Sequence, residues 1–139
     1  MSKSTSARII DPRFTTLTVT GSSTLSDVTL GDVSSNQLVV GSSKTASTGP
    51  GTVPVTSSLH EITADNATDP LTLADGTDGQ VLMFIYVAES EAGDSAVLTP
   101  ATFASGNSIT FADLGQTATL LYSSNGGWYV TALNGAVLA

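Results

Sequence analysis

Short runs of β-branched, aromatic and aliphatic residues recur through the second half of the chain, separated by turns that contain Gly, Asn, Asp or Pro. Runs of this length and composition are typical of β-strands. The predicted strands span residues 59–63, 71–73, 81–87, 97–100, 108–111, 118–122 and 127–131. Since no stretch shows sustained helical periodicity, the pattern predicts an all-β fold. A β-sandwich or jelly-roll-like domain is expected over residues 52–139.

The longest apolar run, VLMFIYV over residues 81–87, is rich in β-branched and aromatic residues. A continuous run of this kind predicts a strand that is buried on both faces. It follows the segment ADGTDG at residues 74–79, where Asp-Gly pairs predict tight turns because both residue types tolerate positive φ. Asp75 and Asp78 match half of a calcium loop, but the other oxygen ligands are missing, so turn formation is the better interpretation.

The clearest hairpin signal joins residues 118–122 to residues 127–131 through the sequence Ser-Ser-Asn-Gly. The Asn-Gly pair at 125–126 favours a type I′ turn. Adjacent strand residues point to opposite faces. We therefore expect Trp128 in the core and Tyr129 at the surface.

Three further segments are expected before this domain. Residues 1–16 are Ser/Thr-rich and mildly basic, and they predict an extended arm, either a frayed terminus or an arm that orders on a partner. Residues 17–51 hold short β-type runs closed by glycines, which predict a short-strand repeat segment wrapped with other copies, or a simple meander. Residues 42–58 are small and polar with two prolines, and they predict a linker with a domain boundary near residue 52.

Charge is divided unequally along the chain. All four basic residues lie in the first 44 positions beside three acids, whereas the nine acids from Glu61 to Asp113 are accompanied by no Lys or Arg. An acidic domain repels nucleic acid and anionic membranes, so neither is predicted as a partner. The absence of cysteine excludes disulfides and cysteine-based zinc sites. No segment has the apolar length that a signal peptide or a transmembrane helix needs.

Candidates for catalysis are few. His60 is the single histidine, and a surface or satisfied histidine is a better interpretation than a general base because no nucleophile context accompanies it. Glu89, Glu91 and Asp94 could hold a divalent cation between loops, but a solvated acidic loop is the simpler interpretation. No P-loop, HExxH or GxSxG motif occurs. We therefore expect no enzyme, no cofactor and no metal site.

Four segments in order resemble a group of bacteriophage virion proteins, especially those of marine and cyanobacterial phages. The segments are ADGTDGQVL (74–82), GDSAVLTPATFASGNSITF (93–111), TLLYSSNGGWYV (119–130) and NGAVLA (134–139). They are strand-and-turn signatures and not catalytic motifs. Domains of this group occur in capsid decoration proteins, head fibres and tail fibres, usually as trimers.

The resemblance implies a homotrimeric capsid decoration (cement) protein, made in the host cytoplasm and bound to the major capsid protein on the outer surface of the phage head. Capsid contacts are then expected from the basic arm, at Arg8, Ile9, Ile10, Arg13 and Phe14. The trimer core is expected at Leu17, Val19, Val28, Leu30, Leu38 and Val40.

Two other hypotheses stay open. One is a tail or head fibre or spike tip that binds a host surface receptor, with exposed aromatic residues such as Trp128 at its distal surface. The other, with less support, is a polysaccharide hydrolase that uses Glu89 or Glu91.

Overall fold

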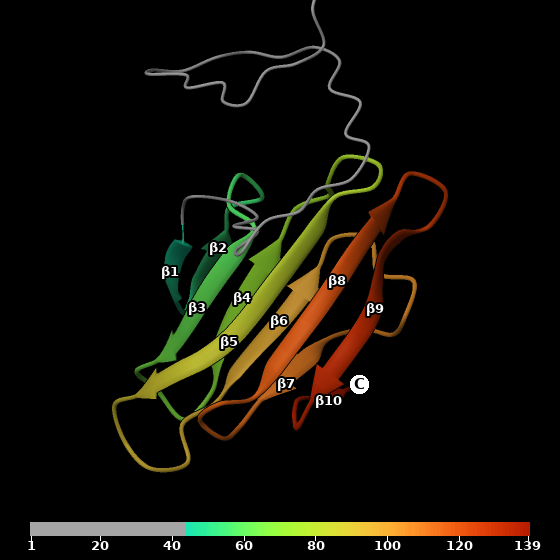
Figure 1. The fold of residues 1–139 in the computed structure, drawn as a ribbon. Helices are drawn as coiled ribbons and strands as arrows, with labels where there is room; N and C mark the ends of the chain where they lie inside the picture. Colours follow the sequence, from blue (N-terminus) through green and yellow to red (C-terminus); the bar gives the residue numbers. More distant parts are fainter. Residues whose placement is uncertain (1–43) are drawn as a thin grey trace, which may run out of the picture. The chain divides into compact units, whose positions relative to one another are not determined.

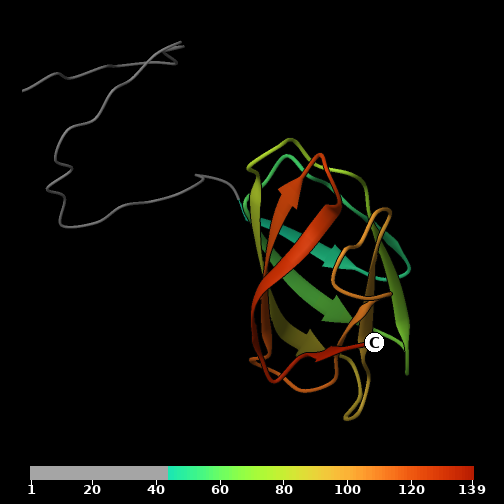
Figure 2. The same cartoon turned by 90° about the vertical axis from the view of Figure 1, so that its right-hand side faces the viewer.

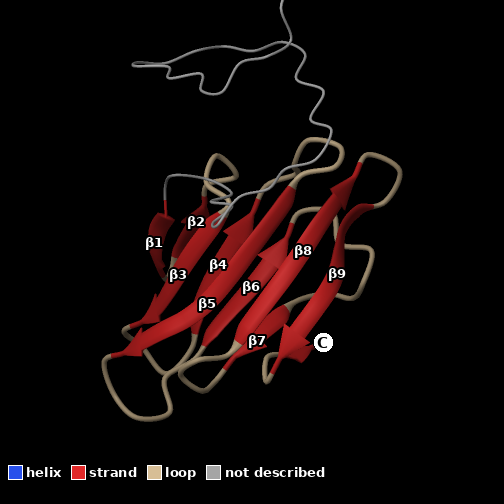
Figure 3. Ribbon diagram, viewed as in Figure 1, coloured by secondary structure: helices blue, strands red, loops and turns tan. Residues whose placement is uncertain are grey.

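A computed structural model describes residues 44–139, which fold into ten β-strands joined by loops (Figure 3). The strands are β1 (Lys44–Thr48), β2 (Gly51–Val53), β3 (Leu59–Ala64), β4 (Asp69–Leu73), β5 (Val81–Glu89), β6 (Ala96–Pro100), β7 (Ile109–Phe111), β8 (Thr117–Ser123), β9 (Gly127–Asn134) and β10 (Val137–Leu138). The predicted all-β class is therefore confirmed for the described residues. This part of the chain contains no helix that could cross a membrane.

The strands form two five-stranded sheets that pack face to face (Figures 1 and 2). The first sheet has the order β1-β3-β5-β8-β9, and the second has the order β10-β7-β6-β4-β2. From β1 to β6 the chain alternates between the sheets, so consecutive strands within each sheet pair in parallel. The remaining pairs are antiparallel. The pairing is thus mixed, and it does not show the antiparallel arrangement of a jelly roll.

The core lies between the two sheets and follows from the alternation of side chains along each strand. Every second residue is buried along β3, β4 and the first part of β5. The largest fully buried apolar side chains come from both layers: Ile62, Leu71, Leu73, Leu82, Phe84, Tyr86, Leu98, Ile109, Phe111, Leu120 and Trp128. Burying a side chain of this kind stabilises the fold by about 1.5–3 kcal/mol relative to exposure. Contact between the layers therefore holds the sheets together.

The predicted linker is wrong for much of its length, because β1 and β2 lie within residues 42–58. β1 pairs with β3, and β2 pairs with β4, so both short strands extend existing sheets. Threonines support this pairing, since Thr52 Oγ1 lies 3.0 Å from Thr72 Oγ1 across the β2–β4 pair. The sheets thus reach back to Lys44, before the boundary expected near residue 52.

Predictions for the N-terminal part of the chain lie outside the described residues. These are the arm over residues 1–16, most of the repeat segment over residues 17–51, the capsid contacts from Arg8 to Phe14, and the trimer core from Leu17 to Val40.

β5 is exposed on one face, in contrast to the two-sided burial predicted from its apolar run. Leu82, Phe84 and Tyr86 point into the core and are fully buried. The outward positions alternate with them: Val81 is 44% and Val87 38% exposed, while Met83 and Ile85 between them are half-buried. The described residues therefore bury one face of this strand fully and leave its other apolar face partly exposed.

The predicted hairpin is confirmed, with β8 and β9 paired from Ser123↔Gly127 to Ala118↔Leu133. Its turn differs from the predicted type I′. Gly126 donates its N–H to the Ser123 carbonyl, and the left-handed residue is Gly127, with φ 88°. Because the described residues include no non-glycine residue with positive φ, Asn125 does not adopt the type I′ conformation. A turn followed by a left-handed glycine is the three-residue alternative.

Trp128 is in the core and Tyr129 is exposed, as predicted from their adjacent positions on β9. The indole Nε1 of Trp128 donates to the Ala74 carbonyl at 2.9 Å, and Tyr122 packs edge-on against the ring with centroids 5.1 Å apart. Trp128 therefore ties the hairpin to the loop after β4. The expectation that it is exposed at a receptor-binding surface is wrong.

Replacing Trp128→Phe removes this hydrogen bond and leaves part of the indole volume empty. We expect the free energy of unfolding to fall by about 1–3 kcal/mol. The matched control is Tyr129→Phe on the opposite face of the same strand, which should change stability by about 0.5 kcal/mol or less. Urea unfolding of both variants measures the difference, and equal effects would contradict the assigned positions.

Candidate functional site

The outer face of the first sheet is apolar, and it is turned toward the viewer in Figure 1. We call its middle part the apolar face; it comprises Leu59, Val81, Met83, Ile85, Val87, Thr117, Thr119, Leu121 and Tyr129. Two charged residues, Glu61 of β3 and Lys44 of β1, point outward beside it. The strand register places Leu59, Met83 and Thr119 in one row and Val81, Leu121 and Tyr129 in another. A shallow hollow of about 410 Å³ lies over β5 between β3 and β8. Glu61 also lines this hollow, so the face offers methyl, thioether and hydroxyl groups with one carboxylate beside them.

Two charged residues on this side of the sheet neutralise each other. Lys44 Nζ lies 2.9 Å and 3.0 Å from the two carboxylate oxygens of Glu61. The lysine side chain is 63% exposed, so the pair stabilises the fold by about 1 kcal/mol or less. Its main consequence is electrostatic, because it leaves the apolar face without net charge.

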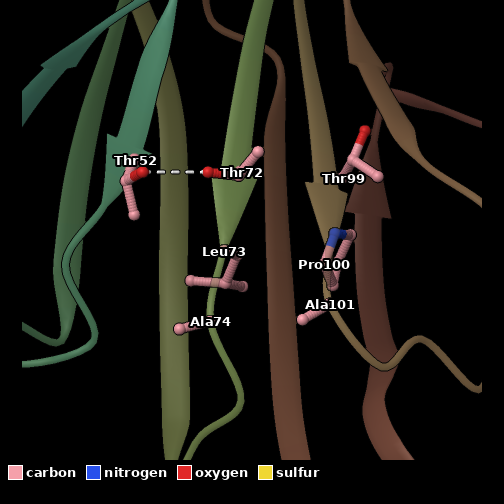
Figure 4. A pocket seen from close by; sticks show the side chains of 7 residues that line it. All are labelled: Thr52, Thr72, Leu73, Ala74, Thr99, Pro100 and Ala101. Carbon is pink, nitrogen blue, oxygen red and sulfur yellow. Dashed lines mark hydrogen bonds between the residues drawn. The ribbon is translucent and has the colours of Figure 1, made fainter.

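The outer face of the second sheet has a different chemistry. Thr52, Thr72 and Thr99 border a hollow of about 410 Å³, with Leu73, Ala74, Pro100 and Ala101 at its end (Figure 4). The hydroxyls of Thr52 and Thr72 contact each other, and no charged residue lines the hollow. Threonine needs an adjacent base to act as a nucleophile. Without a base in the lining, these side chains suit hydrogen bonding and contact.

Carboxylates gather at one end of the domain. Because β3 and β5 are parallel, their C-terminal ends lie at the same end of the sheet. The turn between β7 and β8 lies there too, at the lower end in Figure 1. Ser90 N–H donates to the Ala64 carbonyl and Gly115 N–H to the Tyr86 carbonyl, which holds these loops together. The acidic end comprises Asp65, Asp69, Glu89, Glu91, Asp94 and Asp113. It therefore holds six of the nine carboxylates of the described residues.

Two of these carboxylates are buried and accept hydrogen bonds from neighbouring loop residues. Burial opposes the ionisation of Asp69, but hydrogen bonds from the Asp65 N–H at 2.7 Å and the Asn66 amide at 3.0 Å outweigh it and lower the pKa of Asp69 below its ordinary 3.8. Asp94 accepts hydrogen bonds from Ser90 Oγ and the Glu91 N–H. These contacts fold the loops onto themselves, and the described residues hold no cluster of three or more His, Cys, Asp or Glu that could bind a metal.

Asp75 and Asp78 also accept hydrogen bonds, each from a residue in a different loop. Asp78 Oδ1 accepts the Ser124 N–H at 2.9 Å, and Asp75 Oδ2 accepts Thr102 Oγ1 at 3.2 Å. Each contact joins the loop after β4 to a distant segment of the chain. This geometry agrees with the turn interpretation and not with a calcium loop.

His60 lies fully buried on the inner side of β3. Its Nε2 donates to the Ser57 carbonyl at 2.8 Å, and its ring stacks on Phe84 with centroids 5.1 Å apart. Its Nδ1 has no hydrogen-bond partner among the described residues. Burial lowers the pKa of His60 below its ordinary 6.5, and the hydrogen bond to Ser57 only partly offsets this. Because the ring does not reach the surface, this position does not suit a base acting on an external substrate.

The buried, neutral His60 predicts a loss of stability in mild acid. Its pKa is lowered in the folded state, so the unfolded chain binds the proton more readily once the pH falls below about 6.5. The free energy of unfolding should fall by up to about 1.4 kcal/mol per pH unit between this pH and the lowered pKa.

Urea unfolding at several pH values from 7.5 to 5 measures this slope. The variant His60→Gln keeps a donor but has no group that titrates, so its slope should be smaller over the same range. Equal slopes in the two proteins would show that His60 does not cause the effect. Asp69 does not interfere, because its lowered pKa places its own contribution below this pH range.

No protein-family model matches the chain, and no curated protein matches its sequence. The functional argument therefore rests on the surfaces themselves. The apolar face was not predicted as a site. Its signal was present in the unbroken run at residues 81–87, which was interpreted as burial between layers of one domain.

Proposed function

We propose that this protein is a non-enzymatic virion structural protein, specifically a capsid decoration protein that binds the outer surface of a phage head as a homotrimer. In this proposal the protein holds neighbouring capsid subunits together by binding to them, and it presents its own surface outward. The major capsid protein is the partner on the shell.

The observation that supports this proposal most strongly is the separation of charge. Residues 1–16 carry three basic residues and one acid, whereas residues 44–139 carry nine acids and one lysine. Six of those acids lie together at the acidic end. A basic arm suits attachment to a partner, and an acidic domain keeps decorated particles apart by like-charge repulsion.

The segments that resemble phage virion proteins also support it. In the fold they supply the loop between β4 and β5, the stretch from β6 to β7, the β8–β9 hairpin and the end of the chain. These parts join the two sheets through contacts such as the Trp128 hydrogen bond to Ala74. The resemblance therefore concerns residues that define the architecture of the domain.

Electron cryo-microscopy of the virion tests the location directly. The proposal predicts many copies arranged on the outer surface of the head. A few copies at the tip of the tail or of a fibre would favour the receptor-binding alternative instead. Density for the domain inside the shell would contradict both.

Removing residues 1–16 should abolish attachment to undecorated heads, because the basic and apolar groups of the arm are lost. The double variant Arg8→Glu/Arg13→Glu reverses two charges at full length and should weaken attachment at least about tenfold. Ser4→Ala/Ser6→Ala is the matched control and should bind normally. Co-sedimentation with heads measures binding, and normal decoration by the truncated chain would show that the arm is not the attachment element.

A further inference from the structure

The apolar face is unusual for a sheet surface in water. An exposed sheet face normally carries polar side chains that alternate with the core residues along each strand. Along β5 the outward residues are Val81, Met83, Ile85 and Val87, and none of them is polar. Contiguous apolar surface of this kind marks an interaction site in a soluble protein.

The neighbouring strands extend this apolar surface. Leu59 of β3 lies opposite Met83 on one side, and Leu121 of β8 lies opposite Val81 on the other. The apolar face spans four strands, β3, β5, β8 and β9. With strands spaced about 4.8 Å apart and about six residues rising about 3.3 Å each, it measures about 19 Å by 20 Å. That size suits the centre of a protein–protein interface with a polar rim.

Charge decides which partner fits. The described residues carry nine acids and one lysine, so two copies repel each other in most orientations. The apolar face is different, because Lys44 neutralises Glu61 and the other carboxylates lie in loops or at strand ends, at the two ends of the domain. This face has no unpaired carboxylate that would attract a basic partner. A second copy, in contrast, would bring an equally neutral and apolar surface to the contact.

We infer that the apolar face is a self-association surface, covered by a second copy of this chain. Contact between copies removes Met83, Ile85 and Leu59 from water, and burial of this apolar surface drives the association. The shallow hollow over β5 accommodates side chains of the neighbouring copy. The inference rests on the proposed function only for the number of copies, and it places a contact between copies on the described domain in addition to residues 17–40.

Sedimentation of the full-length chain over a range of concentrations tests the inference. The unmodified protein should associate reversibly. Met83→Glu and Ile85→Glu place an unpaired carboxylate at the centre of the face, and each should weaken association at least about tenfold. Thr110→Glu is the matched control, since it adds the same charge at a half-buried outward position of β7 in the other sheet, and it should associate normally.

A charge exchange separates an interface role from a purely structural one. Lys44→Glu leaves two like charges on each apolar face, so copies should repel and association should weaken. The double variant Lys44→Glu/Glu61→Lys restores a neutral pair with its direction reversed, and it should restore association. Urea unfolding at a concentration where the protein is dissociated should give similar midpoints for all variants, because an exposed pair stabilises little.

Three results would overturn the inference. A chain that is monomeric at every concentration would show that a second copy does not cover the face. A folded Met83→Glu protein that associates normally would place the interface elsewhere, as would failure of the charge exchange to restore association. The location of the protein on the virion, measured separately, distinguishes this inference from the proposed function. If Met83→Glu loses association but copies are found only on the tail, the decoration proposal is refuted and the self-association surface is supported.

Discussion

The alternation of side chains along β3 and β5 is the constraint on which the rest of the structure depends. One set of positions, including Ile62, Phe84 and Tyr86, fills the space between the sheets and is fully buried. The other set must then point away from the core, whatever its chemistry. Because β5 is apolar at both sets of positions, the described residues bury one set and leave the other, apolar set at the outer face. The proposed contact between copies would thus use the strand that also builds the core.

The distribution of charge acts with this constraint. Most carboxylates lie in loops or at strand ends, above all at the acidic end, while one neutralised pair, Lys44 and Glu61, lies on β1 and β3 beside the apolar face. Repulsion between acidic domains keeps most orientations apart, and the neutral face offers an orientation without that penalty. Stability within the domain comes from buried side chains such as Trp128. In the proposed self-association, specificity would come from the surface where charge is absent.

The strand pattern allowed the all-β class, the strands β3 to β9, the β8–β9 hairpin and the burial of Trp128 to be predicted, but not the short strand β10. β1 and β2 could not be predicted, because Ser- and Thr-rich segments become strands only when β3 and β4 offer edges to pair with. The turn was mispredicted because Gly127, and not Asn125, takes the left-handed conformation. The apolar face was visible in the run at 81–87, but periodicity cannot distinguish burial within a chain from burial between chains.

The most direct test of the central claim uses the one methionine on the apolar face and no mutation. Hydrogen peroxide converts exposed methionine to its sulfoxide, and mass spectrometry reports the rate at Met83, with added free methionine as the reference. If a second copy covers the face, oxidation of Met83 slows as the protein concentration rises, while the reference rate stays constant. A rate at Met83 that is the same at every concentration would contradict the account.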